Sequence, residues 1–324
     1  MPAVALRPES EAPTTARTIP APIQTSSGLR SFWSNRNRRY TALMGYAFIA
    51  PVMIYVTVVH VGPIVASLYL SFTRYQILTP PVWVGVGNYR RILLDDPLFW
   101  PAMRTTAQYS LEVLPLNIVL SLGLALLVNR AVRGIALFRT LYYLPVVTSI
   151  IAVSMIWLWL YEPRSGLLNL LLDRLGMGPV NWLGDPELAL HSLVLMRVWR
   201  GIGWNMVIYL AGLQGIPHEL YEAVELDGGS AFKKFRHVTW PLLRPVTYYI
   251  VVMGLISTFQ TFAEVYAMTG GGPLGRTTTV AYLIYQRAFQ YFEMGEASSV
   301  AFSLAMVIFG LSLINVRYFR SAVE

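Results

Sequence analysis

Cysteine is absent from this chain of 324 residues. Its absence excludes a disulfide framework, a thiolate metal site and a cysteine nucleophile. Lysine occurs only at Lys233 and Lys234, and neither stands in the Gly-Lys-Ser/Thr arrangement with which a P-loop holds nucleotide phosphates. The chain therefore carries no Walker-type ATP site. The His-Glu-x-x-His and Gly-x-Ser-x-Gly motifs are also missing, so no catalytic constellation is visible.

Charged residues are also scarce. Only 13% of the residues are charged and 55% are hydrophobic, whereas a soluble domain carries about a quarter charged residues. This balance predicts an integral membrane protein. The net charge of +8 could indicate a nucleic-acid partner, but the basic residues lie where they would orient the chain in a membrane, so we expect no nucleic acid.

The chain instead contains long apolar runs. A membrane-spanning helix needs about 20 mainly apolar residues, and the alternating pattern of a β-barrel is missing. We therefore predict an all-α integral membrane protein with six transmembrane helices, the first of which can continue past Pro63 to about Phe72. The six segments are 41–62, 105–128, 137–161, 188–213, 246–268 and 296–318.

The positions of the basic residues predict the orientation. With the amino terminus inside, the inner connections carry more Lys and Arg than the outer ones, as the positive-inside rule requires. Both termini are then cytoplasmic. Residues 1–40 lack an apolar run before position 41 and predict a disordered basic tail without a signal peptide, which leaves 41–324 as the membrane domain.

A polar stretch, residues 217–245, separates the fourth and fifth segments and is too polar to lie in lipid. Pro217 and the acids after it suit the first turn of a helix, predicted over 218–226. Asp227-Gly228-Gly229 is a strong helix stop. Ser230 can cap a second short helix over 231–240, and two prolines then control entry into the fifth span.

This stretch would form an exposed acidic knob that fits a groove on another protein. The alternative is an amphipathic helix lying on the membrane surface. Helices of that kind usually carry Lys and Arg on their polar face, whereas the first helix here is acidic.

The stretch resembles the "EAA" signature of permease subunits of binding-protein-dependent ABC importers. The resemblance rests on Glu222-Ala223, Asp227-Gly228 and the prolines Pro241 and Pro245, with Val224 and Gly229 standing where the family pattern has alanine. Other pieces are similar to the sugar-importing maltose/trehalose-type branch. They are Leu144-Pro145, the Pro-x-x-Gly-x-x-Asn of 163–169, the Ala-Gly-Leu of 211–213 and the Gly-Gly-Gly-Pro of 270–273.

The resemblance implies that 218–226 is a coupling helix seated in a cytoplasmic ATPase. It implies a second homologous permease, two ATPase subunits that hold ATP and Mg, an extracytoplasmic sugar-binding lipoprotein and surrounding membrane lipid. The location would be the bacterial cytoplasmic membrane, and this chain would be neither an enzyme nor a cofactor carrier. The expected coupling residues are Glu219, Leu220, Tyr221, Glu222, Ala223, Glu225, Asp227 and Gly228.

Polar residues in the fourth and fifth segments are the candidates for a sugar site, because a sugar needs hydrogen-bonding side chains and an aromatic platform. The register of the resemblance places family sugar contacts in the same two segments. The alternative is structural, since intramembrane Ser and Thr often bond to neighbouring helices and Arg can snorkel outward. The candidates are Arg200, Gly201, Trp204, Asn205, Ser257, Thr258, Gln260, Thr261 and Glu264.

The resemblance leads us to expect the permease subunit of an ATP-driven importer for a disaccharide such as trehalose or maltose. Another oligosaccharide or a glycerol-phosphate compound would also fit, and the arginines Arg197 and Arg200 leave room for an anionic ligand. Glu112 is a further candidate pore residue or the partner of one of these arginines. The alternative functions are a self-sufficient secondary transporter or channel and, with least support, an intramembrane enzyme.

Overall fold

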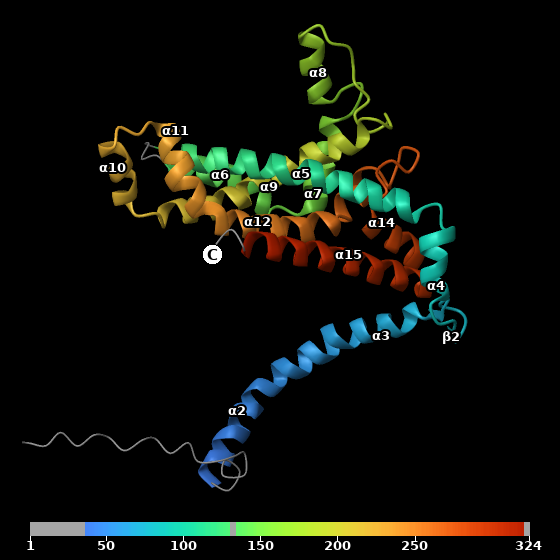
Figure 1. The fold of residues 1–324 in the computed structure, drawn as a ribbon. Helices are drawn as coiled ribbons and strands as arrows, with labels where there is room; N and C mark the ends of the chain where they lie inside the picture. The colour runs from blue at the N-terminus through green and yellow to red at the C-terminus, as the bar shows by residue number, and fades with distance from the viewer. Residues whose placement is uncertain (1–35, 130–133, 321–324) are drawn as a thin grey trace, which may run out of the picture. The chain divides into compact units, whose positions relative to one another are not determined.

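The protein is described by a computed structural model that covers residues 36–129 and 134–320 and is mostly helical (Figure 1). Within these residues four helices are long and apolar enough to cross a membrane, and a bent helix pair makes five if it counts as one span. The number six therefore stays a prediction. The four helices are Tyr40–Ser71, Phe99–Val128, Ala231–Phe259 and Met294–Arg317, and the bent pair is Leu137–Val147 with Ile150–Leu160.

The chain divides into two units, Met1–Pro63 and Ile64–Glu324. The unit boundary falls within the first helix, which consists of α2 (Arg36–Tyr55), η1 (Val56–Val61) and α3 (Gly62–Ser71). Its length confirms that the first span continues past Pro63, which follows the π-helical turn η1 without ending the helix. Residues 36–40 of the expected tail already belong to α2, and the rest of that tail lies outside the described residues.

Four long helices form the framework of the second unit: α5 (Phe99–Val128), α9 (Ala189–Gln214), α12 (Trp240–Phe259) and α15 (Met294–Arg320). Helix α5 lies against α9 and α12, and α12 also contacts α15 (Figure 1). Helix α9 covers the fourth predicted segment. The hydroxyl of its buried Tyr209 donates a hydrogen bond of 3.1 Å to the Thr247 hydroxyl of α12. These contacts hold the two segments predicted to carry the sugar site side by side.

The third segment is not the single helix predicted over 137–161. It consists of α6 (Ile135–Val147) and α7 (Ile150–Leu160), which bend by 101° at Thr148-Ser149. Pro145 has no N–H to continue the α6 ladder, and Thr148 is extended. Arg200 of α9 donates to the carbonyl oxygens of Val146 and Thr148, at 3.4 and 3.3 Å, and so satisfies part of the opened helix end.

The fifth segment begins earlier and ends earlier than predicted. Helices α11 (Ala231–Lys234), η3 (Phe235–Thr239) and α12 form one run, so the expected separate helix over 231–240 is wrong. Pro241 falls in the first turn of α12 and does not interrupt it. The run stops at Phe259 and continues after a break as α13 (Ala263–Met268), which corrects the single helix over 246–268.

Short elements connect the long helices. They include the antiparallel pair β1 and β2, in which Thr73 lies opposite Trp83. Buried Arg287 of η4 pairs with Asp96, which follows η2, and with Glu296 of α15, and so ties two of these connections to a long helix. The elements are β1 (Thr73–Arg74), β2 (Val82–Trp83), α4 (Gly87–Arg90), η2 (Arg91–Asp95), α8 (Leu167–Arg174), α10 (His218–Leu226), α14 (Val280–Tyr285) and η4 (Gln286–Gln290).

Candidate functional site

The polar stretch between α9 and α12 forms the knob expected from the sequence. Helix α10 spans His218–Leu226, directly after Pro217, as predicted. Gly228 has a φ of +69°, a left-handed conformation that glycine adopts without strain, so the predicted helix stop is confirmed; residues 227–229 are called the hinge below. The Ser230 side chain accepts a hydrogen bond from the Lys233 main-chain N–H at 3.4 Å and caps α11, also as predicted.

Helix α10 leaves most of its surface open. Every residue in it is exposed or half-buried, and Figure 1 shows it with α11 at one end of the long helices of the second unit. Leu220 is 42% exposed and Leu226 is 90% exposed, although burial of leucine is favourable. Acidic side chains surround them. The predicted coupling residues therefore share one accessible knob, apart from Tyr221, which is half-buried.

Two contacts tie α10 to the helical run that follows it, and a third lies within α10. The Tyr221 and Thr239 hydroxyls form a hydrogen bond of 3.1 Å between α10 and η3. His218 lies 2.9 Å from Glu222 within the helix. Lys234 donates to the Glu225 carboxylate, and this hydrogen bond and the lysine charge lower the pKa of Glu225. Thr239 is buried, whereas every residue of α10 is exposed or half-buried, so α10 is positioned without being buried itself.

The two departures from the family pattern lie against each other. A Cβ added at Gly229 would lie 2.3 Å from Val224 Cγ1 and 2.5 Å from the Val224 carbonyl oxygen. Both the side chain and the main chain of Val224 thus leave no room for alanine at 229. The larger residue at 224 accompanies the smaller residue at 229.

Two adjoining cavities, of about 370 and 510 Å³, lie among α5, α9 and α12 and the breaks of the third and fifth segments. Both are lined by Arg197, Arg200, Met253 and Ser257. The structure brings all nine predicted sugar-site residues to these cavities. Gly201, Trp204, Asn205 and Thr258 line the first, Gln260, Thr261 and Glu264 the second, and Arg200 and Ser257 both.

Charged and polar side chains in and around the cavity walls contact one another. Glu264 of α13 is 3% exposed, accepts a hydrogen bond from the Tyr109 hydroxyl at 3.0 Å and lies 3.7 Å from Arg197. Arg197 also donates to the Ser257 hydroxyl. The suggestion that Glu112 pairs with an arginine of α9 is wrong, because Glu112 instead contacts His191 at 2.7 Å.

Helix α5 contributes groups that the sequence analysis missed. Ser110 and Thr258 share a hydrogen bond of 2.7 Å, and Asn117 accepts one from Asn205 at 2.6 Å. A Cβ at Gly201 would lie 2.5 Å from the Asn117 amide nitrogen, so the small residue lets α5 and α9 approach. The available signal was that Ser110 and Asn117 are polar groups inside a segment predicted to cross the membrane.

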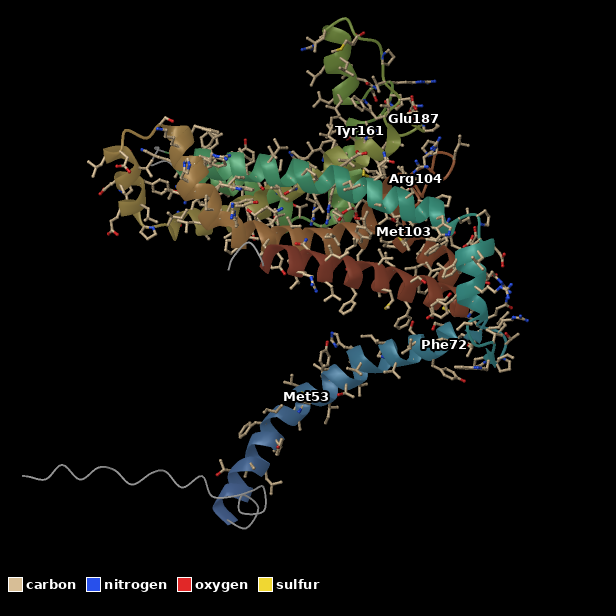
Figure 2. All side chains as sticks on the ribbon, viewed as in Figure 1. Met53, Phe72, Met103, Arg104, Tyr161 and Glu187 are labelled. Carbon is tan, nitrogen blue, oxygen red and sulfur yellow. The ribbon has the colours of Figure 1, made fainter. Side chains whose placement is uncertain are left out.

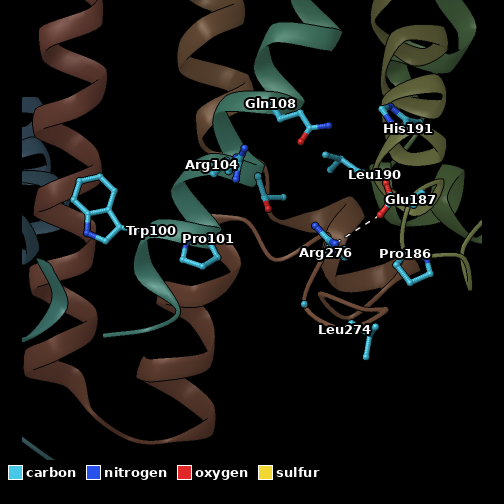
Figure 3. A pocket seen from close by; sticks show the side chains of 12 residues that line it. Trp100, Pro101, Arg104, Gln108, Pro186, Glu187, Leu190, His191, Leu274 and Arg276 are labelled. Carbon is cyan, nitrogen blue, oxygen red and sulfur yellow. Dashed lines mark ion pairs between the residues drawn. The ribbon is translucent and has the colours of Figure 1, made fainter. Parts of the chain in front are cut away.

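A third cavity, of about 690 Å³, lies near the start of α5 and the segment before α9. Figure 2 shows Arg104 and Glu187 near one another at the end of the unit away from α10. Figure 3 shows the 3.6 Å ion pair between Arg276 of the glycine-rich loop and Glu187. The structure places this loop at the edge of the cavity, where Leu274, Gly275 and Arg276 line it.

A sequence profile for the family described as "Binding-protein-dependent transport system inner membrane component" matches residues 117–319. The matched region holds the knob and most of both cavity walls. The chain belongs to this family. Its members are membrane translocation subunits, so the predicted membership in the permeases of binding-protein-dependent ABC importers is confirmed, and the importer is favoured over a self-sufficient carrier or an enzyme.

Relatives and solved structures agree. The probable ABC transporter permease protein YesP of Bacillus subtilis (strain 168) is 36% identical over 294 residues, which cover 90% of this chain and 94% of YesP. The trehalose/maltose transport system permease protein MalF of Thermococcus litoralis is 33% identical over 285 residues, which cover 86% of this chain and 95% of MalF.

A chain of a bacterial ABC transporter involved in import of the acidic polysaccharide alginate has the same fold. It superposes with a TM-score of 0.80 at 21% identity, over 91% of this chain and 100% of that chain. The family assignment and this shared fold make the protein a component of a binding-protein-dependent transport system in the inner membrane.

Proposed function

We propose that this chain is a permease subunit of an ATP-driven sugar importer and forms part of the path through which the sugar crosses the membrane. The observation that carries the proposal is the coexistence of an exposed knob at α10 with polar cavities among the long helices. Relatives named for arabinooligosaccharide and lactose transport support a sugar as cargo. Trehalose and maltose remain candidates through MalF, within a broader class of di- and oligosaccharides.

Helix α10 is the coupling helix in this proposal. Its open leucines and acids would enter a groove of a cytoplasmic ATPase subunit, which also holds ATP and Mg. Because α10 is joined to α9 and, through the Gly228 hinge, to the α11–α12 run, a pull on α10 would move both cavity walls. The path would then open to one side or the other.

The remaining partners follow from the same proposal. A second, homologous permease would complete the path, and two ATPase subunits would supply the energy. An extracytoplasmic sugar-binding protein would deliver sugar near the cavity edged by the Arg276–Glu187 pair. We count α9 and the bent pair α6–α7 as spans, which gives six transmembrane helices with both termini in the cytoplasm.

Reconstitution tests this function. Proteoliposomes that contain the whole complex, the binding protein and enclosed ATP should accumulate labelled sugar, and those that contain this chain alone should not. Sugar movement by the chain alone, driven by an ion gradient, would contradict the proposal. So would uptake by the complex that does not depend on ATP.

A further inference from the structure

The two cavities among α5, α9 and α12 carry one more positive charge than negative charge. Arg197, Arg200 and Glu264 are the charged residues among those that line them, and arginine stays protonated in proteins. Glu264 is 3% exposed and lies 3.7 Å from Arg197. These two charges offset each other, so the charge on Arg200 is left over.

No carboxylate pairs with Arg200 in the part of the chain that the structure describes. Its Nη2 donates to the carbonyl oxygens of Val146 and Thr148 at 3.4 and 3.3 Å, which is long for an N–H···O hydrogen bond. Its Nε is buried and has no hydrogen-bond partner among the described residues. Carbonyl oxygens at a helix end offset only part of a full charge.

A ligand with one negative charge would complete this site. We propose that the path takes an acidic sugar with one carboxylate on the unit that reaches Arg200, such as a uronate-containing oligosaccharide. The carboxylate would accept hydrogen bonds from Arg200, because a planar carboxylate matches a guanidinium edge. Trp204 would face the C–H side of the sugar, and Ser257 would bond to its hydroxyls. This inference rests on the proposed sugar-importer function.

A matched pair of sugars tests the charge. The whole complex, purified in detergent without the binding protein, is titrated by calorimetry with digalacturonate and with galactobiose, which has CH₂OH in place of each carboxylate. The acidic sugar should bind at least about tenfold more tightly, the low end of what a hydrogen bond to a charged group supplies. Added salt should reduce the difference.

Three variants assign the effect to Arg200. Arg200→Gln should abolish the preference, and Arg200→Lys, which keeps the charge but not the fork, should retain part of it. Arg244→Gln is the matched control, since Arg244 lies on α12, is exposed and does not line these cavities. Gel filtration shows whether each variant still assembles. If Arg200→Gln does not, the Arg200→Lys variant decides between a weakened and an unchanged preference.

The outcomes separate this inference from the function beneath it. The acidic-sugar proposal is overturned if the two sugars bind equally well, if the neutral sugar binds more tightly or if neither binds. It is also overturned if the assembled Arg200 variants keep an unchanged preference. ATP-driven uptake of a neutral sugar in any of those cases would leave the importer function standing. Loss of all ATP-driven sugar uptake in the wild-type complex would overturn the importer function itself.

Discussion

The α10 knob and the cavities among the long helices both concentrate polar groups in a mostly apolar chain. They differ in how far their charged side chains are exposed. In α10 the Glu222 side chain is 61% exposed, and its one ion pair is with a histidine of the same helix. In the cavity wall Glu264 is 3% exposed and is held by groups from α5 and α9. Open charges suit contact with another protein, whereas enclosed charges fix helix positions or face a ligand.

The largest expected effect comes from breaking the enclosed pair. Glu264→Gln removes the carboxylate that offsets Arg197 and leaves a guanidinium in a largely enclosed site. We expect a loss of about 3 kcal/mol in the free energy of unfolding, because removing one partner of a buried pair leaves the other uncompensated. Denaturant unfolding of the purified chain in detergent measures this loss.

Two further variants test whether the enclosed charge causes this loss of stability. The double variant Arg197→Gln with Glu264→Gln should recover much of the loss, because no lone charge remains. Glu222→Gln in α10 should change stability by less than about 0.5 kcal/mol, as expected for an exposed position. Equal losses for Glu264→Gln and Glu222→Gln would erase the difference drawn between the two regions.

A smaller effect is expected at the hinge of the knob. Gly229→Ala places a methyl group against Val224 and should cost about 1–3 kcal/mol, the usual range for overpacking. Hydrogen exchange of the α10 amides should speed up. Val224→Ala in the same chain should restore part of the protection, but not all, since the Val224 carbonyl oxygen also lies too close. Unchanged exchange in Gly229→Ala would contradict the paired fit.

The smallest effect concerns acid. The hydrogen bond from Lys234 and its charge lower the pKa of Glu225 in the folded protein. The pair therefore adds stability above the usual glutamate pKa of 4.5, and this contribution is lost as the pH falls through the lowered value. We expect a slight, salt-sensitive decrease in the melting temperature at acid pH that is absent in Glu225→Gln. An equal decrease in that variant would assign it to other groups.

The sequence predicted the knob in more detail than the membrane helices. The bounds of α10, the Gly228 hinge and the Ser230 cap depend on neighbours in the chain, and local chemistry determines them. The bend in the third segment could not be read in the same way. Pro145 alone allows either a kink or a break, and Arg200, which bonds to the opened end, comes from a distant helix.

The sequence predicted which residues of the fourth and fifth segments line the cavities, but not which contacts they make. Polar residues stand out in apolar segments, so those of the fourth and fifth segments could be named. Which groups pair depends on how three helices pack. Glu264 therefore meets Arg197 and Tyr109, whereas Glu112, which was expected near the arginines, meets His191.

In the proposed function, α10 transmits the energy of ATP hydrolysis to the cavities. The most direct measurement is sugar uptake into proteoliposomes by complexes that carry Glu222→Lys and Gly228→Val, with assembly and ATP hydrolysis measured on the same samples. Both variants should insert in the membrane, while ATP-driven uptake should fall to the level of vesicles without ATP. Uptake at the wild-type rate in both variants would contradict it.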